Sequence, residues 1–331
     1  MEYRKLGNSD LKISAVAFGA WAAGGWMWGG TEPNDAVNAI RTAYDSGVTS
    51  IDTAPVYGQG TSEEVVGEAI KILPRDKVQI LTKYGLRWDL KKGQFYFKTE
   101  DNQGNQIDLY KLASKESIIT ECENSLRRLG TDYIDLYQIH WPDTTTPIQE
   151  TMEAVSHLIK DGKVRYAGVC NYDADLVKEA DKYTAIISDQ VPYSMVRRSI
   201  ENELIPFALK NNKSILAYSP LQRGLLTGKM KPGHKFADGD NRGDLFYFSD
   251  ENIRRTNEFL DKIKPVADEK NATIAQVVIR WTLDQPGITI ALVGARNPKQ
   301  ARENAGAADI KFNPAEIDFI TKELNNLKLI K

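Results

Sequence analysis

The sequence has few of the residues that build disulfide-linked or metal-centred proteins. Only two of its 331 residues are cysteine and only three are histidine. Cys122 and Cys170 can form one bridge at most, which excludes a disulfide framework. No histidine has a cysteine or histidine partner nearby in the sequence, so we expect no metal site. The chemistry has to come from other side chains.

Long apolar runs and a strong net charge are also missing. Residues 1–14 contain no basic segment that leads into an apolar core, and no apolar run approaches the roughly 18 residues of a membrane span. Lysine and arginine number 43 against 45 acidic residues, which gives a net charge of -2. We therefore expect a cytoplasmic protein with no membrane and no nucleic-acid partner.

What the sequence does contain is an alternation of short β-rich runs and longer helical patterns. The candidate strands are residues 16–18, 49–52, 78–82, 134–139, 166–169, 186–190, 215–218 and 288–293. The candidate helices are residues 34–46, 62–71, 114–129, 147–161, 174–181, 200–211, 273–284 and 298–305. This order predicts a parallel sheet covered by helices, in one domain over residues 1–331. A (β/α)₈ TIM barrel and a doubly wound open sheet share the pattern, so periodicity does not separate them.

Four segments lie outside this repeat. Residues 3–14 predict an N-terminal hairpin, and residues 314–327 predict an extra C-terminal helix. Residues 84–112 and 221–250 predict long loops after the third and seventh strands. Loops of that length in a compact domain are usually functional or disordered.

Polar residues follow the strands at the end where parallel barrels place their active sites. Asp52, Tyr57, Lys83 and His140 stand at or just beyond strand ends. We expect the Lys83 ammonium to lower the pKa of the Tyr57 hydroxyl from about 10, and Asp52 to keep Lys83 charged. His140 would donate a hydrogen bond to a carbonyl oxygen within reach of Tyr57. This set predicts polarisation of a carbonyl group for hydride attack.

The same residues lie in stretches that resemble the aldo-keto reductase family. The matching stretches are residues 51–54, 57–58, 82–83, 129–136, 139–142, 162–165, 168–171 and 218–221. Residues 137–143 and 294–296 make the chain most similar to bacterial general stress and inositol-operon reductases, and more distantly to potassium-channel β subunits. The resemblance implies a (β/α)₈ barrel, a nicotinamide cofactor, a small carbonyl substrate, and Asp52, Tyr57, Lys83 and His140 as catalytic residues.

The resemblance also implies where the cofactor binds. Asn171 and Gln190 would bond to the nicotinamide carboxamide, Tyr218 would stack on the ring, and the loop 221–229 would close over the pyrophosphate. The full implied set is Gly19, Ala20, Trp21, Asp52, Cys170, Asn171, Gln190, Tyr218, Ser219, Pro220, Leu221, Gln222, Gly224, Leu226, Lys229, Gly294, Arg296, Gln300, Glu303 and Asn304.

Two positions depart from the family pattern. Cys170 stands where many relatives have serine, and a thiol is the weaker hydrogen-bond donor. Gly294 and Gln300 stand where well-known animal members have lysine and arginine, which leaves Arg296 as the cation for the adenosine phosphate. We expect NADPH to be preferred, with NADH as the alternative.

The substrate side is predicted from tryptophans. Trp21, Trp26, Trp28, Trp88 and Trp141 all fall in expected loops, where they either line an apolar substrate pocket or anchor the loops. The predicted function is NADPH-dependent reduction of aldehydes or ketones. The alternatives are a redox-sensing regulatory module and the oxidation of a sugar, polyol or inositol derivative. The oligomeric state stays open, and a monomer is compatible with the sequence.

Overall fold

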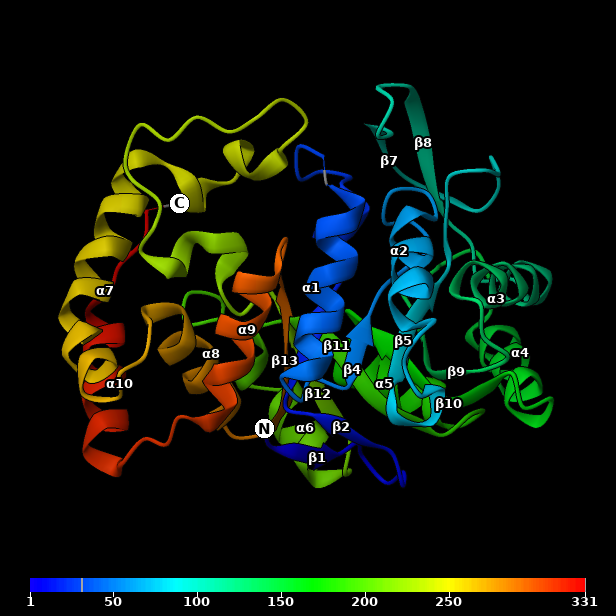
Figure 1. The fold of residues 1–331 in the computed structure, drawn as a ribbon. Helices are drawn as coiled ribbons and strands as arrows, with labels where there is room; N and C mark the ends of the chain where they lie inside the picture. The colour runs from blue at the N-terminus through cyan, green and yellow to red at the C-terminus, as the bar shows by residue number, and fades with distance from the viewer. Residues whose placement is uncertain (31, 331) are drawn as a thin grey trace.

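A closed barrel of eight parallel strands forms the centre of the molecule, shown in Figure 1 as a computed structural model that describes residues 1–30 and 32–330. The strands are β3 (Val16–Gly19), β4 (Ser50–Asp52), β5 (Gln79–Tyr84), β9 (Ile134–Ile139), β10 (Val164–Cys170), β11 (Ile186–Pro192), β12 (Ser214–Tyr218) and β13 (Ile288–Gly294). The last strand pairs with the first, with Val293 opposite Phe18. The predicted barrel is confirmed, and the open sheet is excluded because β13 and β3 leave no free edge between them.

Helices cover the outside of this barrel. They are α1 (Pro33–Asp45), α2 (Thr61–Ile70), α3 (Lys115–Leu129), α4 (Ile148–Lys160), α5 (Ala174–Asp181), α6 (Leu204–Lys210), α8 (Ile274–Asp284) and α9 (Pro298–Gly306). Each carries buried apolar residues on one side, for example Ala36, Ile40 and Ala43 on α1. Helix α8 begins with a capping box, in which Thr273 and Gln276 each bond to the other's backbone N–H. No described helix is long and apolar enough to cross a membrane.

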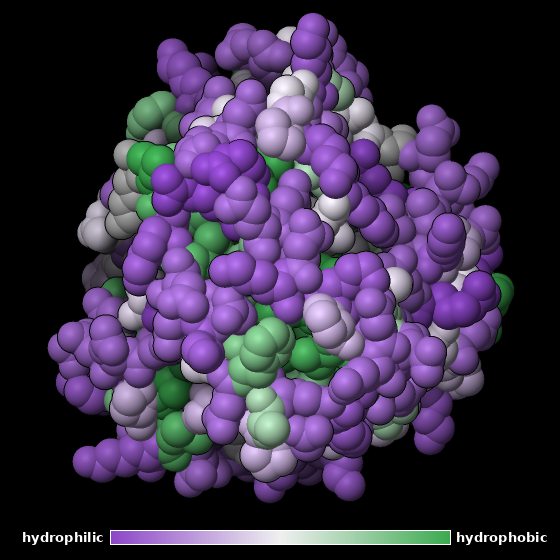
Figure 2. All heavy atoms as spheres, turned by 90° about the vertical axis from the view of Figure 1, so that its left-hand side faces the viewer, coloured by the Kyte–Doolittle hydropathy of each residue, from purple (hydrophilic) through white to green (hydrophobic). Residues whose placement is uncertain are grey.

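One long helix was missing from the sequence prediction. Helix α7 (Asp250–Glu269) follows the loop after β12, where we expected no helix. Its many charged residues and the internal Pro265 are not typical of a helix pattern, although one side of α7 carries the apolar residues Phe259, Leu260 and Ile263. Figure 2 views the molecule from the side of α7 and α10 (Pro314–Asn326) and shows polar side chains over most of that face, with scattered apolar spots. Helix α10 confirms the predicted C-terminal helix.

The two ends of the barrel differ in what covers them. The antiparallel pair β1 (Tyr3–Lys5) and β2 (Lys12–Ser14) confirms the predicted hairpin and lies at one end (Figure 1). Leu6 and Ile13 from this hairpin belong to the same buried cluster as Leu81 and Leu136 of the barrel interior. Its turn requires Gly7, whose φ is +52° and where a Cβ would lie 2.5 Å from the Ile187 carbonyl oxygen. Because the hairpin packs against the barrel interior at this end, we expect the active site at the opposite end.

The segment 84–112 is not the long loop that we predicted. It contains an antiparallel sheet of β6 (Leu86–Arg87), β7 (Gln94–Glu100) and β8 (Gln106–Lys111), in the order β6-β8-β7. Its hairpin rises beyond the barrel end opposite to β1 and β2 (Figure 1). The Trp26 indole N–H donates to the Glu100 carbonyl oxygen at 3.0 Å, and Asn102 Nδ2 donates to the Gly24 carbonyl oxygen at 2.8 Å. These bonds hold the sheet against the loop that follows β3.

The segment 221–250 keeps the irregular character that we expected. It contains three short 3₁₀ helices, η4 (Gln222–Thr227), η5 (Asn241–Asp244) and η6 (Phe246–Phe248). Leu225, Met230 and Phe248 bury themselves in a small cluster with Ile253 of α7. The segment therefore has a core of its own, which supports it over the barrel end.

Candidate active site

A cavity of about 790 Å³ opens at the C-terminal ends of the barrel strands. Its walls come from the loops after β3, β4, β9, β12 and β13 and from the sheet β6–β8. Such a volume lies within the usual range for small-molecule and cofactor sites. The cavity is where the fold predicts an active site.

The four predicted catalytic residues meet at the bottom of this cavity. Lys83 Nζ donates to Asp52 Oδ1 at 2.7 Å and to the Thr53 carbonyl oxygen at 2.8 Å. The same Nζ lies 5.0 Å from the centroid of the Tyr57 ring, and the rings of Tyr57 and His140 meet edge to face at 5.5 Å. Asp52, Tyr57 and His140 line the cavity, whereas Lys83 is fully buried behind them.

Burial controls the protonation of the site. It raises the pKa of Tyr57 above its ordinary value, and the nearby Lys83 charge only partly offsets this. Lys83 acts to lower the pKa of Tyr57, as we predicted, but the pKa still lies above its ordinary value because desolvation of the phenolate is the larger effect. Burial and the Lys83 charge hold the pKa of His140 well below its usual range. The site thus holds a protonated phenol beside a neutral imidazole.

Lys83 itself stays charged. Burial disfavours the ammonium, but the Asp52 carboxylate together with Tyr57 and Cys170 more than offsets this, so the pKa of Lys83 is raised. Gln190 Nε2 donates to the second Asp52 oxygen at 2.7 Å, so both oxygens of the buried carboxylate are bonded. An ion pair shielded from water in this way keeps a fixed positive charge close to Tyr57.

Asn171 and Tyr218 form a second bonded group on the cavity wall. Asn171 Nδ2 donates to the His140 carbonyl oxygen at 3.0 Å, and the Tyr218 hydroxyl donates to Asn171 Oδ1 at 3.0 Å. Asn171 adopts a left-handed backbone with φ of 59°. The side chains of Asn171 and Gln190 therefore have set directions, and each amide nitrogen keeps one further proton for a ligand.

Most residues that the family resemblance implies for the cofactor line the cavity. They are Gly19, Trp21, Asp52, Asn171, Gln190, Tyr218, Ser219, Pro220, Leu221, Gly224, Lys229, Gly294, Arg296, Gln300, Glu303 and Asn304. Ala20, Cys170, Gln222 and Leu226 do not line it. They are buried in the surrounding structure, where Gln222 Oε1 accepts from the Ser194 hydroxyl at 3.0 Å. Burial raises the pKa of the Cys170 thiol.

The tryptophans divide in a similar way. Trp21, Trp26, Trp28 and Trp141 line the cavity, whereas Trp88 does not line it and packs against a buried cluster that includes Leu109. Trp21 stacks on Tyr57 with 5.9 Å between ring centroids, and Trp28 meets Trp21 edge to face at 5.5 Å. The aromatic wall therefore continues directly from the Tyr57 ring.

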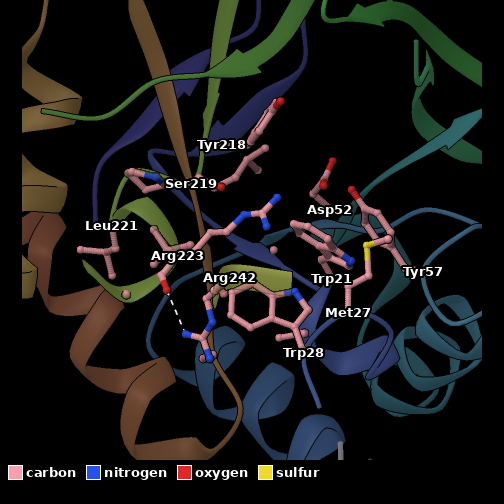
Figure 3. A pocket seen from close by; sticks show the side chains of 18 of the residues that line it. Trp21, Met27, Trp28, Asp52, Tyr57, Tyr218, Ser219, Leu221, Arg223 and Arg242 are labelled. Carbon is pink, nitrogen blue, oxygen red and sulfur yellow. Dashed lines mark hydrogen bonds between the residues drawn. The ribbon is translucent and has the colours of Figure 1, made fainter. Parts of the chain in front are cut away.

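Several lining residues were not among the predicted site residues. They include Met27, Val56, Leu86, Tyr96, Phe97, Asn241 and Arg242. Arg223 also lines the cavity and lies in the loop 221–229 that we expected to close over the pyrophosphate. Three consecutive aromatic residues, Phe95 to Phe97, were a signal for Tyr96 and Phe97, but only if the segment had been interpreted as a strand. Arg242 gave no local signal, because its place depends on a contact with the distant Trp28, whose ring centroid lies 4.9 Å from the guanidinium carbon (Figure 3).

The cavity residues fit a nicotinamide dinucleotide in size, charge and shape. Of the residues that the structure describes, four cations line it, Arg223, Lys229, Arg242 and Arg296, which suits ligands that carry several negative charges. Gly294 presents bare backbone, where the nearest atom to an added Cβ would be the Gly19 carbonyl oxygen at 3.5 Å. The indole N–H groups of Trp21 and Trp28 are buried donors without a protein acceptor. Among the described residues, no three His, Cys, Asp or Glu side chains gather as metal ligands would.

Comparisons with known proteins agree with this geometry. Residues 15–325 match the Aldo/keto reductase family. The chain is 39% identical over 305 residues to the aldo-keto reductase YhdN of Bacillus subtilis, covering 91% of this chain and 86% of that protein. It is 38% identical over 316 residues to the NADH-specific methylglyoxal reductase of Escherichia coli, covering 94% of each.

A solved structure shows the same similarity in three dimensions. The glycerol dehydrogenase of Gluconobacter oxydans superposes with a TM-score of 0.87 at 35% identity, covering 98% of this chain and 95% of that one. Together with the sequence matches, this covers almost the whole barrel and its loops. The chain belongs to the aldo-keto reductase family and is a nicotinamide-dependent oxidoreductase that acts on carbonyl or alcohol groups.

Proposed function

We propose that this enzyme reduces small aldehydes, and also ketones, to alcohols with NADPH, and that Tyr57 is the proton donor. The observation that carries the proposal is the grouping of Tyr57, neutral His140 and the buried Lys83–Asp52 pair at the bottom of one cavity. Tyr57 is protonated at neutral pH, as a proton donor must be, and the nearby Lys83 ammonium favours its ionisation when the proton is given up.

The bound nicotinamide would supply the hydride to the carbonyl carbon. His140 donates an N–H to the carbonyl oxygen and holds it against the Tyr57 hydroxyl. Tyr57 transfers its proton to that oxygen as negative charge develops there. The Lys83 ammonium stabilises the phenolate that remains, and Asp52 keeps the ammonium charged and in place.

The residues along the rest of the cavity would hold the cofactor. Tyr218 offers its ring to the nicotinamide, and Asn171 and Gln190 offer amide protons to the carboxamide. The loop 221–229 offers backbone N–H groups to the pyrophosphate. We infer that the cavity residues Gly294, Gln300, Glu303 and Asn304 surround the adenosine. Gly294 ends β13, and the other three lie on the following helix α9.

The preference for NADPH over NADH would rest on Arg296. Its guanidinium lines the cavity and donates to the Trp28 carbonyl oxygen at 2.5 Å. Burial lowers the pKa of Arg296, and the positive charge of the nearby Arg242 acts in the same direction. Asp240 neutralises Arg242 through a bond of 2.6 Å, so Arg296 is left to meet a phosphate. Because the Escherichia coli relative is named an NADH-specific reductase, NADH is the competing cofactor.

The direct test is the absorbance of NADPH and NADH during incubation with a panel of small aldehydes that includes methylglyoxal. We expect NADPH to be consumed faster than NADH at equal concentrations. If neither cofactor is consumed above background although calorimetry shows that it binds, the reductase proposal is wrong and a redox-sensing binding protein is favoured.

A second candidate is the oxidation of a polyol, because one similar structure is a glycerol dehydrogenase. Oxidation needs the phenolate form of Tyr57 to accept a proton, and the raised pKa of its hydroxyl keeps this form scarce at neutral pH. Comparing the initial rates of aldehyde reduction and glycerol oxidation at pH 7 separates the two directions. A faster oxidation would favour the dehydrogenase.

A further inference from the structure

Arg223 is a cation of the cavity wall that lacks an acidic partner. Its NH1 donates to Asn241 Oδ1 at 2.9 Å. Among the described residues, no ion pair includes Arg223, whereas Arg242 pairs with Asp240 at 2.6 Å and Lys229 with Glu303 at 3.7 Å. Its five N–H groups therefore retain free capacity for an anion.

The Arg223 side chain lies in the part of the cavity near Asp52 and Tyr57. The Arg223 guanidinium carbon is 4.7 Å from the centroid of the Trp21 ring, and Trp21 in turn stacks on Tyr57. Figure 3 shows Arg223 reaching across the pocket toward Trp21 on the side of Asp52 and Tyr57, while Arg242 packs beside Trp28. One aromatic ring thus separates the guanidinium from the proposed proton donor.

The backbone around Arg223 adopts a conformation that is unfavourable for residues with side chains. Gln222, Arg223 and Gly224 have φ values of 45°, 53° and 98°, so two residues with side chains occupy the left-handed region. Such conformations persist where the surroundings fix them. Here the Arg242 NH1 donates to the Arg223 carbonyl oxygen at 3.0 Å, the contact drawn in Figure 3. The turn aims Arg223 into the cavity.

The electrostatic surroundings disfavour this charge on balance. Burial lowers the pKa of Arg223 and the positive charges of Arg197 and Arg242 act in the same direction, while Tyr218 and Asp240 only partly oppose them. A buried cation without a partner is costly, and a bound anion removes much of that cost. A guanidinium is also well shaped to bind a carboxylate or phosphate through two parallel hydrogen bonds.

We propose that Arg223 binds an anionic group of the substrate, so that the preferred substrates are small carbonyl compounds carrying a carboxylate or a phosphate. The proposal rests on the reductase function proposed above. The pyrophosphate of the cofactor offers similar chemistry. The position beside Trp21, which stacks on Tyr57, favours the substrate.

The test compares two aldehydes of equal carbon number, succinic semialdehyde with a carboxylate and butanal without one. Wild-type enzyme is expected to have the higher kcat/KM for succinic semialdehyde. In Arg223→Gln this value falls roughly 10- to 100-fold, the usual effect of losing a hydrogen bond to a charged group, while the value for butanal changes less than about three-fold. Arg223→Lys restores part of the loss, and Arg254→Gln on exposed α7 is the matched control.

Calorimetry separates the two sources of the anion. The affinity of Arg223→Gln for NADPH should stay close to that of wild type, whereas a fall parallel to the loss of activity would give Arg223 to the pyrophosphate and overturn the proposal. Equal losses for both aldehydes, or no wild-type preference for succinic semialdehyde, would also overturn it.

A binding measurement covers the case in which no aldehyde is turned over. Succinamate has a carboxylate but no aldehyde, so it binds without reacting. Its binding to cofactor-loaded wild type and its loss in Arg223→Gln would support the anion site even if the reductase function fails. Equal binding to both proteins would overturn the anion site. Thermal unfolding followed by circular dichroism checks that each variant is folded.

Discussion

The ammonium of Lys83 lies 2.7 Å from Oδ1 of Asp52, and both side chains are shielded from water. The pair matters less for stability than for charge, because burying two ions costs about as much as their attraction returns. What it provides is a positive charge that does not titrate near neutral pH, at a fixed position behind Tyr57.

Replacing Lys83 with methionine should destabilise the fold and abolish most of the activity. The change leaves the buried Asp52 carboxylate without its counter-charge, which typically costs about 3–5 kcal/mol. Asp52→Asn combined with Lys83→Met should recover part of that loss, since no unpaired ion remains. Urea unfolding of the single and double variants measures the difference. Simple additivity of the two changes would argue against a coupled pair.

Tyr57→Phe should lower kcat by roughly 10²- to 10⁴-fold, the usual contribution of a positioned proton donor. The ring that stacks on Trp21 is kept, so cofactor affinity should change little. Steady-state kinetics and calorimetry with NADPH check the two halves of this statement. Turnover close to wild type would rule out Tyr57 as the essential acid.

The rate of reduction should be insensitive to Tyr57 ionisation from neutral pH up to about 10, the ordinary value for tyrosine. The required form is the protonated phenol, and burial raises its pKa, so this form persists across that range and is lost only at higher pH. A pH profile of kcat/KM for reduction measures this. A descending limb near pH 8 that disappears in a Tyr57 variant would contradict the raised pKa.

Arg296→Ala should weaken NADPH binding more than NADH binding, because only NADPH carries the adenosine phosphate. We expect a loss of roughly 10-fold or more for NADPH, as for other hydrogen bonds to charged groups. Lys299→Ala, an exposed neighbour on α9, serves as the control. Equal losses for the two cofactors would show that Arg296 does not distinguish them.

The sequence could predict the barrel because each strand is a short apolar run and each helix a periodic one. Strand β9 agrees with its prediction at both ends, since residues 134–139 are uniformly buried. The insertions were harder. In 84–112 glycine and charged residues interrupt the apolar ones, and only pairing between β7 and β8 makes the segment a sheet. In α7 the internal proline and the charged side obscured a helix that packing against α8 and α10 stabilises.

The sequence by itself determined which groups are available for catalysis: strand ends carry Asp52, Lys83 and His140, and Tyr57 follows in a loop. The tertiary structure decided what those groups do. It showed that desolvation outweighs the Lys83 charge at Tyr57, and that Gln190 bonds to Asp52. It also brought Arg223 against Trp21 from a loop about 200 residues away. Burial and contacts between distant segments set pKa values and side-chain directions, and neither is written in local sequence.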